Sequence, residues 1–202
     1  IASAHEGEVR IWDARRELGP LAVNNINNIN NNNSQVSQLQ QATSTTQCVS
    51  FITAHMSTIT SLDWSPFNHD ELVTCGADRY IKVWQVSTQS EINILSNVPV
   101  RKVKYLPVSF GHYGLITVAS KNEHCPRIYT IAKDMSSIQS KHLCQEHHKD
   151  IIRNFEMRST NQQQQQMITV SKDQTMKIWD MEPLRNILTS ESAADELLVA
   201  KR

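Results

Sequence analysis

The stretch Asp78-Arg79-Tyr80-Ile81-Lys82-Val83-Trp84 decides the fold, because it recurs as Asp173-Gln174-Thr175-Met176-Lys177-Ile178-Trp179. In both copies an aspartate lies six residues before a tryptophan, and apolar residues alternate with polar ones between them. Such alternation predicts a strand with one buried face. A third copy, Glu6-Gly7-Glu8-Val9-Arg10-Ile11-Trp12-Asp13, has glutamate in place of the aspartate. The chain is therefore built from internal repeats.

A histidine upstream of each aspartate extends the match. His55 is followed by Ile59, Leu62 and Trp64, and His148 is followed at the same offsets by Ile152, Phe155 and Met157. The histidine lies 29 residues before tryptophan in one copy and 31 in the other, which carries five consecutive glutamines at 162–166. A match in two separate parts of the unit is hard to obtain by chance.

Short β-like runs separated by turns occupy most of the remaining sequence. Their spacing of roughly ten residues predicts an all-β architecture of antiparallel hairpins. No amphipathic helix interrupts the series before the tail at 191–202, which is expected to be a short helix or linker. The predicted strands are 59–64, 71–75, 81–86, 92–95, 100–105, 115–119, 128–131, 142–144, 151–157, 167–171, 176–180 and 185–188.

Composition excludes several classes of protein. Twenty Lys+Arg balance twenty Asp+Glu, whereas a protein that tracks nucleic-acid phosphates needs a basic face. No run of eighteen apolar residues is present, which argues against a membrane span. The four cysteines lie far apart, which argues against a zinc site and for free thiols in a reducing, cytoplasmic compartment. They are Cys48, Cys75, Cys125 and Cys144.

Two polar segments stand apart from the repeats. Residues 24–33 hold eight Asn and two Ile, the polar bias continues to residue 47, and the second segment is the glutamine run at 162–166. Both bury too little apolar surface to offset the entropy of ordering, so we expect flexible loop insertions. A self-associating, prion-like patch is the alternative. The chain opens on Ile1-Ala2-Ser3, already within an element, and we expect it to be a fragment.

These repeats resemble the WD40 repeat, whose unit is a four-stranded propeller blade of about 40–45 residues. The resemblance implies a partial WD40 β-propeller of about three full blades plus part of a fourth, over residues 1–190. The partial blade is 1–53, with the insertion at 24–47, and the others are 55–95, 96–145 and 148–190. The blade 96–145 is degenerate, because Ser96 replaces His, Glu123 replaces Asp and Tyr129 replaces Trp.

Ser171, His148 and Asp173 invite comparison with a catalytic triad. The WD40 resemblance implies a structural role instead, in which Trp179, Ser171, His148 and Asp173 form a buried hydrogen-bonded tetrad. An incomplete tetrad is expected at His55, Asp78 and Trp84, because Gly76 stands where the hydroxyl residue is expected, and a weaker one at Glu6 and Trp12. We therefore expect no catalytic residue and no enzymatic activity.

No cofactor or metal is expected. The histidines outside the tetrads do not cluster, and only five glycines occur in the chain, without a glycine-rich phosphate loop. One further motif, Trp12-Asp13-Ala14-Arg15, resembles the W-D-x-R sequence by which some WD40 proteins dock on cullin-type ubiquitin ligase adaptors. Arg15 offers a planar donor fork to a carboxylate. The alternative interpretation is a solvated basic turn.

The sequences of the strands are similar to those of the WD repeat-containing protein 59 family, whose members are subunits of the GATOR complex (SEA complex in fungi). The segments that carry this resemblance include 4–15, 54–59, 62–66, 93–100, 114–118 and 171–179. It implies a non-enzymatic scaffold in amino-acid signalling to TOR complex 1, held at the lysosomal or vacuolar surface through its protein partners. Contact positions are expected just before each turn carboxylate, at His5, Ala77, Asn122 and Lys172. The alternative function is a substrate receptor of a cullin-type ligase.

Overall fold

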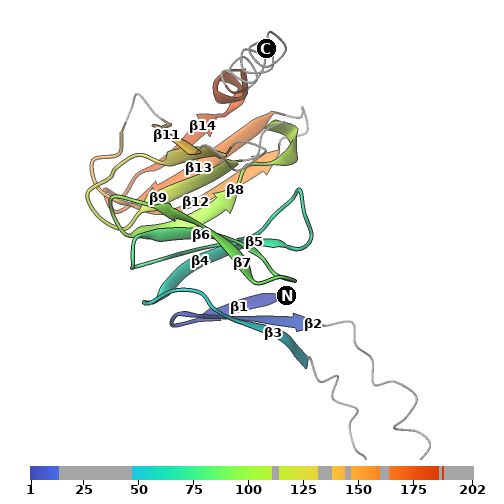
Figure 1. The fold of residues 1–202 in the computed structure, drawn as a ribbon. Coiled ribbons are helices and arrows are strands. Elements are labelled where there is room, and N and C mark those ends of the chain that lie inside the picture. Colours follow the sequence, from blue (N-terminus) through green and yellow to red (C-terminus); the bar gives the residue numbers. More distant parts are fainter. Residues whose placement is uncertain are drawn as a thin grey trace, which may run out of the picture.

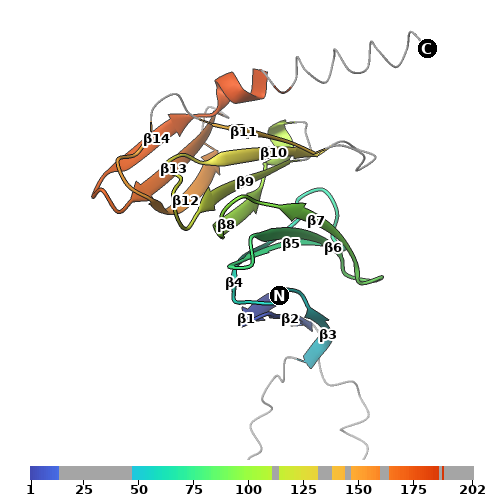
Figure 2. The ribbon, with the colours of Figure 1, turned by 60° about the vertical axis from the view of Figure 1, so that its left-hand side comes forward.

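The computed structural model describes residues 1–13, 47–110, 114–131, 138–143, 147–159, 164–186 and 188. Their strands form four antiparallel sheets that follow one another along the chain (Figure 1). Figure 2 shows the sheets fanned out from the first to the last. The prediction of an all-β architecture is confirmed.

Within each sheet, neighbouring strands are consecutive in the chain. The first sheet holds β1 (Ala2–His5), β2 (Glu8–Asp13) and β3 (Gln47–Thr53). The second holds β4 (Ile59–Trp64), β5 (Glu71–Gly76), β6 (Tyr80–Gln85) and β7 (Ser90–Leu95). The third holds β8 (Val100–Tyr105), β9 (Gly114–Ala119), β10 (Arg127–Ile131) and β11 (Ile138–His142), with a 3₁₀ turn, η2 (Val108–Phe110). The last holds β12 (Ile152–Ser159), β13 (Gln165–Ser171) and β14 (Met176–Asp180).

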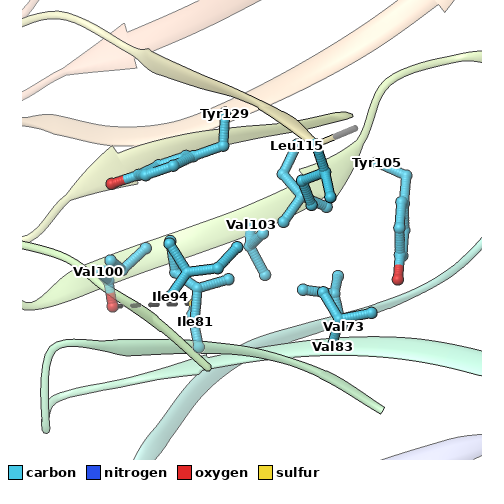
Figure 3. Close-up of a cluster of buried hydrophobic side chains, with 11 residues drawn as sticks. Val73, Ile81, Val83, Ile94, Val100, Val103, Tyr105, Leu115 and Tyr129 are labelled. Atoms are coloured by element: carbon cyan, nitrogen blue, oxygen red, sulfur yellow. Dashed lines mark hydrogen bonds between the residues drawn. The ribbon is translucent and has the colours of Figure 1, made fainter. Parts of the chain in front are cut away.

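Apolar side chains fill the space between each sheet and the next. Figure 3 shows the cluster between the second and third sheets, where Val73 and Ile81 face Val103 and Leu115. Because the middle sheets are covered on both faces, all six residues of β5 and of β9 are buried. A strand buried on both faces needs a nearly continuous apolar run, which is the sequence of β9, whereas β5 also buries Glu71 and Thr74.

The first strands of the second, third and last sheets share one irregularity. Each has a register shift after its first residue, so that Thr60 in β4, Arg101 in β8 and Arg153 in β12 have no cross-strand partner in the register. Each of these strands lies at an edge of its sheet, and β8 contacts both β4 and β12. We call the line of these three strands the inner edge.

The strand predicted at 185–188 is wrong, because residues 182–186 are helical. The Asp180 carboxylate accepts a hydrogen bond from the backbone N–H of Glu182, one of the donors left unpaired at a helix start. Pro183 in the first turn needs no such partner. Helical spacing lets Leu184 and Leu188 pack on the core between the third and last sheets.

Two smaller differences also involve strand ends. The strand predicted at 142–144 is β11, which runs from Ile138 to His142. Part of the expected glutamine loop is strand, because Gln165 and Gln166 begin β13. Gln166 accepts two hydrogen bonds from the Arg158 guanidinium, and Gln165 donates to Ser159, so polar contacts extend the hairpin without apolar burial.

Candidate protein-interaction face and its supporting networks

A chain of hydrogen bonds joins His55, Thr74, Asp78 and Trp84 in the second sheet. Trp84 donates its indole N–H to the Thr74 hydroxyl oxygen (2.9 Å), and that hydroxyl lies 2.8 Å from His55 Nε2. His55 Nδ1 lies 2.9 and 3.0 Å from the two Asp78 carboxylate oxygens. With a neutral ring, every donor has an acceptor: the Thr74 hydroxyl donates to Nε2, and the Nδ1–H group donates to Asp78.

The last sheet repeats this chain with one additional member. Trp179 donates to the Thr169 hydroxyl (2.8 Å), which lies 2.8 Å from His148 Nε2. His148 Nδ1 lies 3.2 Å from an Asp173 oxygen and 3.0 Å from the Thr175 hydroxyl, which itself donates to Asp173 (2.6 Å). The two networks hold their imidazoles in the same way, from a threonine on one side and an aspartate on the other.

The hydroxyl member of each network is not the predicted residue. Ser171 was predicted to lie between Trp179 and His148, but its hydroxyl donates to the backbone carbonyls of Asp150 and Ile151. Thr169 contacts the indole and the imidazole instead. Gly76 likewise does not leave the second network incomplete, because Thr74 supplies the hydroxyl. The physical reason is register. Leu72 lies opposite Trp84, and Thr74, two residues further along, points to the same face.

The sequence contained a signal for these threonines. In both copies a threonine lies four residues before the aspartate and ten before the tryptophan. Thr74 and Thr169 are each fully buried, as a hydroxyl shared between two partners requires.

A catalytic triad is not assembled. The hydroxyl of Ser171 and the His148 ring do not form a hydrogen bond with each other, because each is engaged elsewhere. His148 Nε2, the nitrogen that would take the proton of a nucleophile, contacts Thr169 beneath the sheet surface.

The first sheet keeps only part of the network. Trp12 donates its indole N–H to the Ser3 hydroxyl (2.8 Å). Glu6, predicted to replace the aspartate, is exposed and contributes its backbone carbonyl to the N–H of Ile59. Its neighbour Gly7 accepts hydrogen bonds from the N–H groups of Ala54 and His55. A Cβ at Gly7 would lie 2.2 Å from the His55 carbonyl oxygen, so only glycine allows this approach.

The degenerate third sheet replaces the network with a direct contact. The side chains of Ser96 and Tyr129, which stand where His and Trp are expected, are hydrogen-bonded to each other and both are buried. Burial raises the pKa of the Tyr129 hydroxyl, so it remains a donor. Glu123, at the aspartate position, forms an ion pair with Arg127.

Burial and hydrogen bonding together set the charge states of the networks. Burial lowers the pKa of His55 below the ordinary value of 6.5, although the hydrogen bond that its ring donates to Asp78 acts in the opposite direction. The pKa of Asp173 is held well below its usual range, first by the Thr175 hydroxyl and then by the backbone N–H of Lys149. A neutral imidazole facing a carboxylate is therefore the state that the second sheet favours.

The predicted contact positions that the structure describes are all exposed. His5, Ala77, Asn122 and Lys172 each lie at or next to the connection between two successive strands, at the β1–β2, β5–β6, β9–β10 and β13–β14 connections. Asn122 has a positive φ of 59°, which asparagine tolerates in a turn. Arg15, the tail at 191–202 and most of the 24–47 segment lie outside the described residues.

Hydrogen bonds from these connections run to the loops that join successive sheets. Ala77 donates its N–H to the carbonyl of Thr58, and Lys172 donates to that of Ile151. The Asp78 carboxylate accepts from the N–H of Met56, and that of Asp173 from the N–H of Lys149. Together they give the exposed positions a fixed backbone, which suits a surface for protein contacts.

Within the described residues, no group of three or more His, Cys, Asp or Glu is placed to hold a metal ion. In the same part of the chain, no helix is both long and apolar enough to cross a membrane.

A model of the WD domain, G-beta repeat, matches residues 46–85, which span β3 to β6 and the network of Thr74 and Trp84. This chain contains a WD40 repeat. A chain of the crystal structure of the mitotic checkpoint complex has a similar fold over 89% of this chain and 44% of that chain. The TM-score is 0.60 and the sequence identity is 15%, so this likeness concerns the fold alone.

Several curated proteins align along most of the chain. A WD repeat-containing protein of Dictyostelium discoideum is 26% identical over 90% of this chain and 8% of its own length. The human GATOR2 complex protein WDR59 is 25% identical over 96% of this chain and 17% of its own length. Maintenance of telomere capping protein 5 of Saccharomyces cerevisiae is 23% identical over 89% of this chain and 14% of its own length. The chain thus spans less than a fifth of each of these relatives.

Proposed function

We propose that this WD40-repeat chain is part of a non-enzymatic scaffold subunit in a GATOR-type complex, acting in amino-acid signalling to TOR complex 1. The observation that carries the proposal is the similarity to human WDR59, a GATOR2 complex protein, over 96% of the chain. Propeller blades would be the units 55–95, 96–145 and 148–190. The protein would reach the lysosomal or vacuolar surface through its partners.

The geometry supports a binding role over a chemical one. The buried histidines of the two complete networks are held by threonine and aspartate, and each indole N–H is satisfied. A satisfied buried network fixes the backbone above it. In this chain that backbone carries the exposed positions Ala77 and Lys172.

Affinity purification of the full chain from cells tests the proposal. We expect it to co-purify, in fixed ratio, with several other subunits of one complex, and to respond to amino-acid withdrawal in a TOR complex 1 assay when it is deleted. Recovery with a cullin adaptor instead would favour the substrate-receptor alternative. Recovery as a single chain, with unchanged TOR signalling after deletion, would contradict both.

A further inference from the structure

The inner edge carries an uneven charge in a chain whose overall charge is zero. The strands β8 and β12 hold five basic residues and one acidic residue, Glu156, since β8 has three basic residues and β12 has two. By contrast, β4 has one charged residue, Asp63. The basic residues are Arg101, Lys102, Lys104, Arg153 and Arg158.

Two arginines occupy equivalent bulged positions on neighbouring strands. Arg101 in β8 and Arg153 in β12 each fall at the register shift after the first residue of the strand. A bulge redirects a side chain away from the regular ladder. At the equivalent position of β4, the Thr60 hydroxyl donates to the carbonyl of Val100 and so joins β4 to β8.

Arg101 lacks a comparable partner. Its Nε is buried and has no hydrogen-bond partner among the described residues. An unpaired buried donor costs free energy, and a charged donor costs more than a neutral one. Arg153 is exposed on the next strand, and no ion pair to it is found in the same part of the chain.

Lys102, next to Arg101, links β8 to β12. Its ammonium group donates to Asn154 Oδ1 (2.8 Å), next to Arg153, and forms an ion pair with Glu156. Glu156 also accepts from Lys104 (2.8 Å), so one carboxylate serves two lysines. Two basic groups of β8 therefore share a single, half-exposed counterion on β12.

We propose that Arg101, Lys102 and Arg153 form a site on the inner edge for an oxyanion carried by a partner polypeptide, either a carboxylate or a phosphoserine. Guanidinium groups bind both oxyanions through parallel N–H donors. The inference rests on the proposed scaffold function, because it names the chemistry of one partner. The site is short, since it ends at β4, whose charged residue is the acidic Asp63. A short site suits a few anionic side chains better than the long phosphate backbone of a nucleic acid.

Fluorescence anisotropy with the full chain tests the site. The probes are three labelled twelve-residue peptides of one design, which carry glutamates, phosphoserines or glutamines. We expect the glutamate or the phosphoserine peptide to bind, and the stronger of the two identifies the anion. Arg101→Gln with Arg153→Gln should weaken that binding about tenfold or more. The matched control, Arg10→Gln with Arg79→Gln, changes two exposed arginines elsewhere by the same charge and should change the affinity less than twofold.

The double Arg→Lys variant keeps the charge but removes the planar donor fork, and it should bind with intermediate affinity. Thermal melts will show whether the glutamine variant folds. If it does not, the lysine variant tests whether the arginines bind the peptide. Equal affinities for wild type and variants, or no binding of either anionic peptide, would overturn the site. Tighter binding of a DNA duplex or of anionic phospholipid vesicles would overturn the assignment to a polypeptide. The affinity purification described above distinguishes the two proposals. If the chain co-purifies with a complex but binds neither anionic peptide, the site is wrong and the scaffold function stands.

Discussion

Trp84 donates its indole N–H to the hydroxyl of Thr74 across the strand pair β5–β6, at 2.9 Å. The same hydroxyl contacts His55, so in this network the Thr74 hydroxyl joins the indole ring to the imidazole ring. Its removal leaves two buried polar groups without one of their partners.

Thr74→Val is therefore expected to lower the free energy of unfolding by about 1–3 kcal/mol, while Thr74→Ser retains most of the stability. Urea melts of the full chain measure both. Thr53→Val, at an exposed position of β3, is the matched control and should fall within about 0.5 kcal/mol of wild type. A valine variant as stable as that control would show that the Thr74 hydroxyl contributes little.

Trp84→Ala should destabilise the protein by about 3–5 kcal/mol, at least as much as Trp179→Ala. If Gly76 left the network incomplete, Trp84→Ala would cost less stability than Trp179→Ala. Thr74 completes the network, however, and Trp84 is only 4% exposed. Trp179 is less deeply buried, in a sheet of three strands. Denaturant melts of both variants give the order directly, and a clearly larger loss for Trp179→Ala would contradict it.

Acidification should destabilise the second sheet through His55. Burial lowers the pKa of this histidine in the folded protein, so the unfolded chain takes up the proton first. The stability that the neutral ring provides is complete above about pH 6.5 and is lost as the pH falls towards the lower folded pKa. Thermal melts between pH 7.5 and 5 should therefore show a steeper decline for wild type than for His55→Gln. His5→Gln, at an exposed position, should leave the slope unchanged.

Residues 1–202 expressed alone should self-associate through the outer face of the last sheet. Met176 and Ile178 are 63% and 55% exposed there, whereas Ile81 and Val83, at equivalent positions of β6, are covered by the third sheet. Met176→Lys with Ile178→Lys should shift the protein towards monomer in size-exclusion chromatography with light scattering. Leu95→Lys, at an exposed apolar position of β7, should not. A sharp monomer peak from the unchanged residues 1–202 would contradict the prediction.

Ser171→Ala should remove hydrogen bonds to the carbonyls of Asp150 and Ile151 at a cost of about 1 kcal/mol, and partner binding should persist. An ester-hydrolysis assay supplies the second measurement. If the purified protein hydrolysed esters and this change abolished the activity, the non-enzymatic proposal would be wrong.

The sequence was sufficient for the strands that alternate or are wholly apolar. The predicted ranges 59–64, 100–105 and 176–180 coincide with β4, β8 and β14. It was insufficient at 185–188, where two polar residues followed by two apolar ones fit a strand or a helix equally well. The helix start was decided by the Asp180 carboxylate and Pro183, which are local signals outside the run itself.

The WD40 resemblance implied the tetrad histidines, aspartates and tryptophans, but it did not identify the correct hydroxyl partner. Thr169 and Ser171 both lie on the same face of β13, and only the pairing of Met167 with Trp179 shows which one reaches the indole. The inner-edge arginines could not be found from the sequence, because a bulge depends on the pairing of two strands and leaves no pattern in one of them.

Cross-links between β4 and β8 have a consequence for how the molecule opens. Thr60 and Ser61 donate to the carbonyls of Val100 and Val103, and Tyr105 donates its N–H to Asp63. The opposite edges of these sheets, β7 and β11, are largely exposed. Local unfolding should therefore start at β7 and β11 and move inwards, so that amide hydrogen exchange is fastest in those two strands and slowest in β5 and β9. The sheets would unfold first at β7 and β11, while β4 and β8 remain in contact.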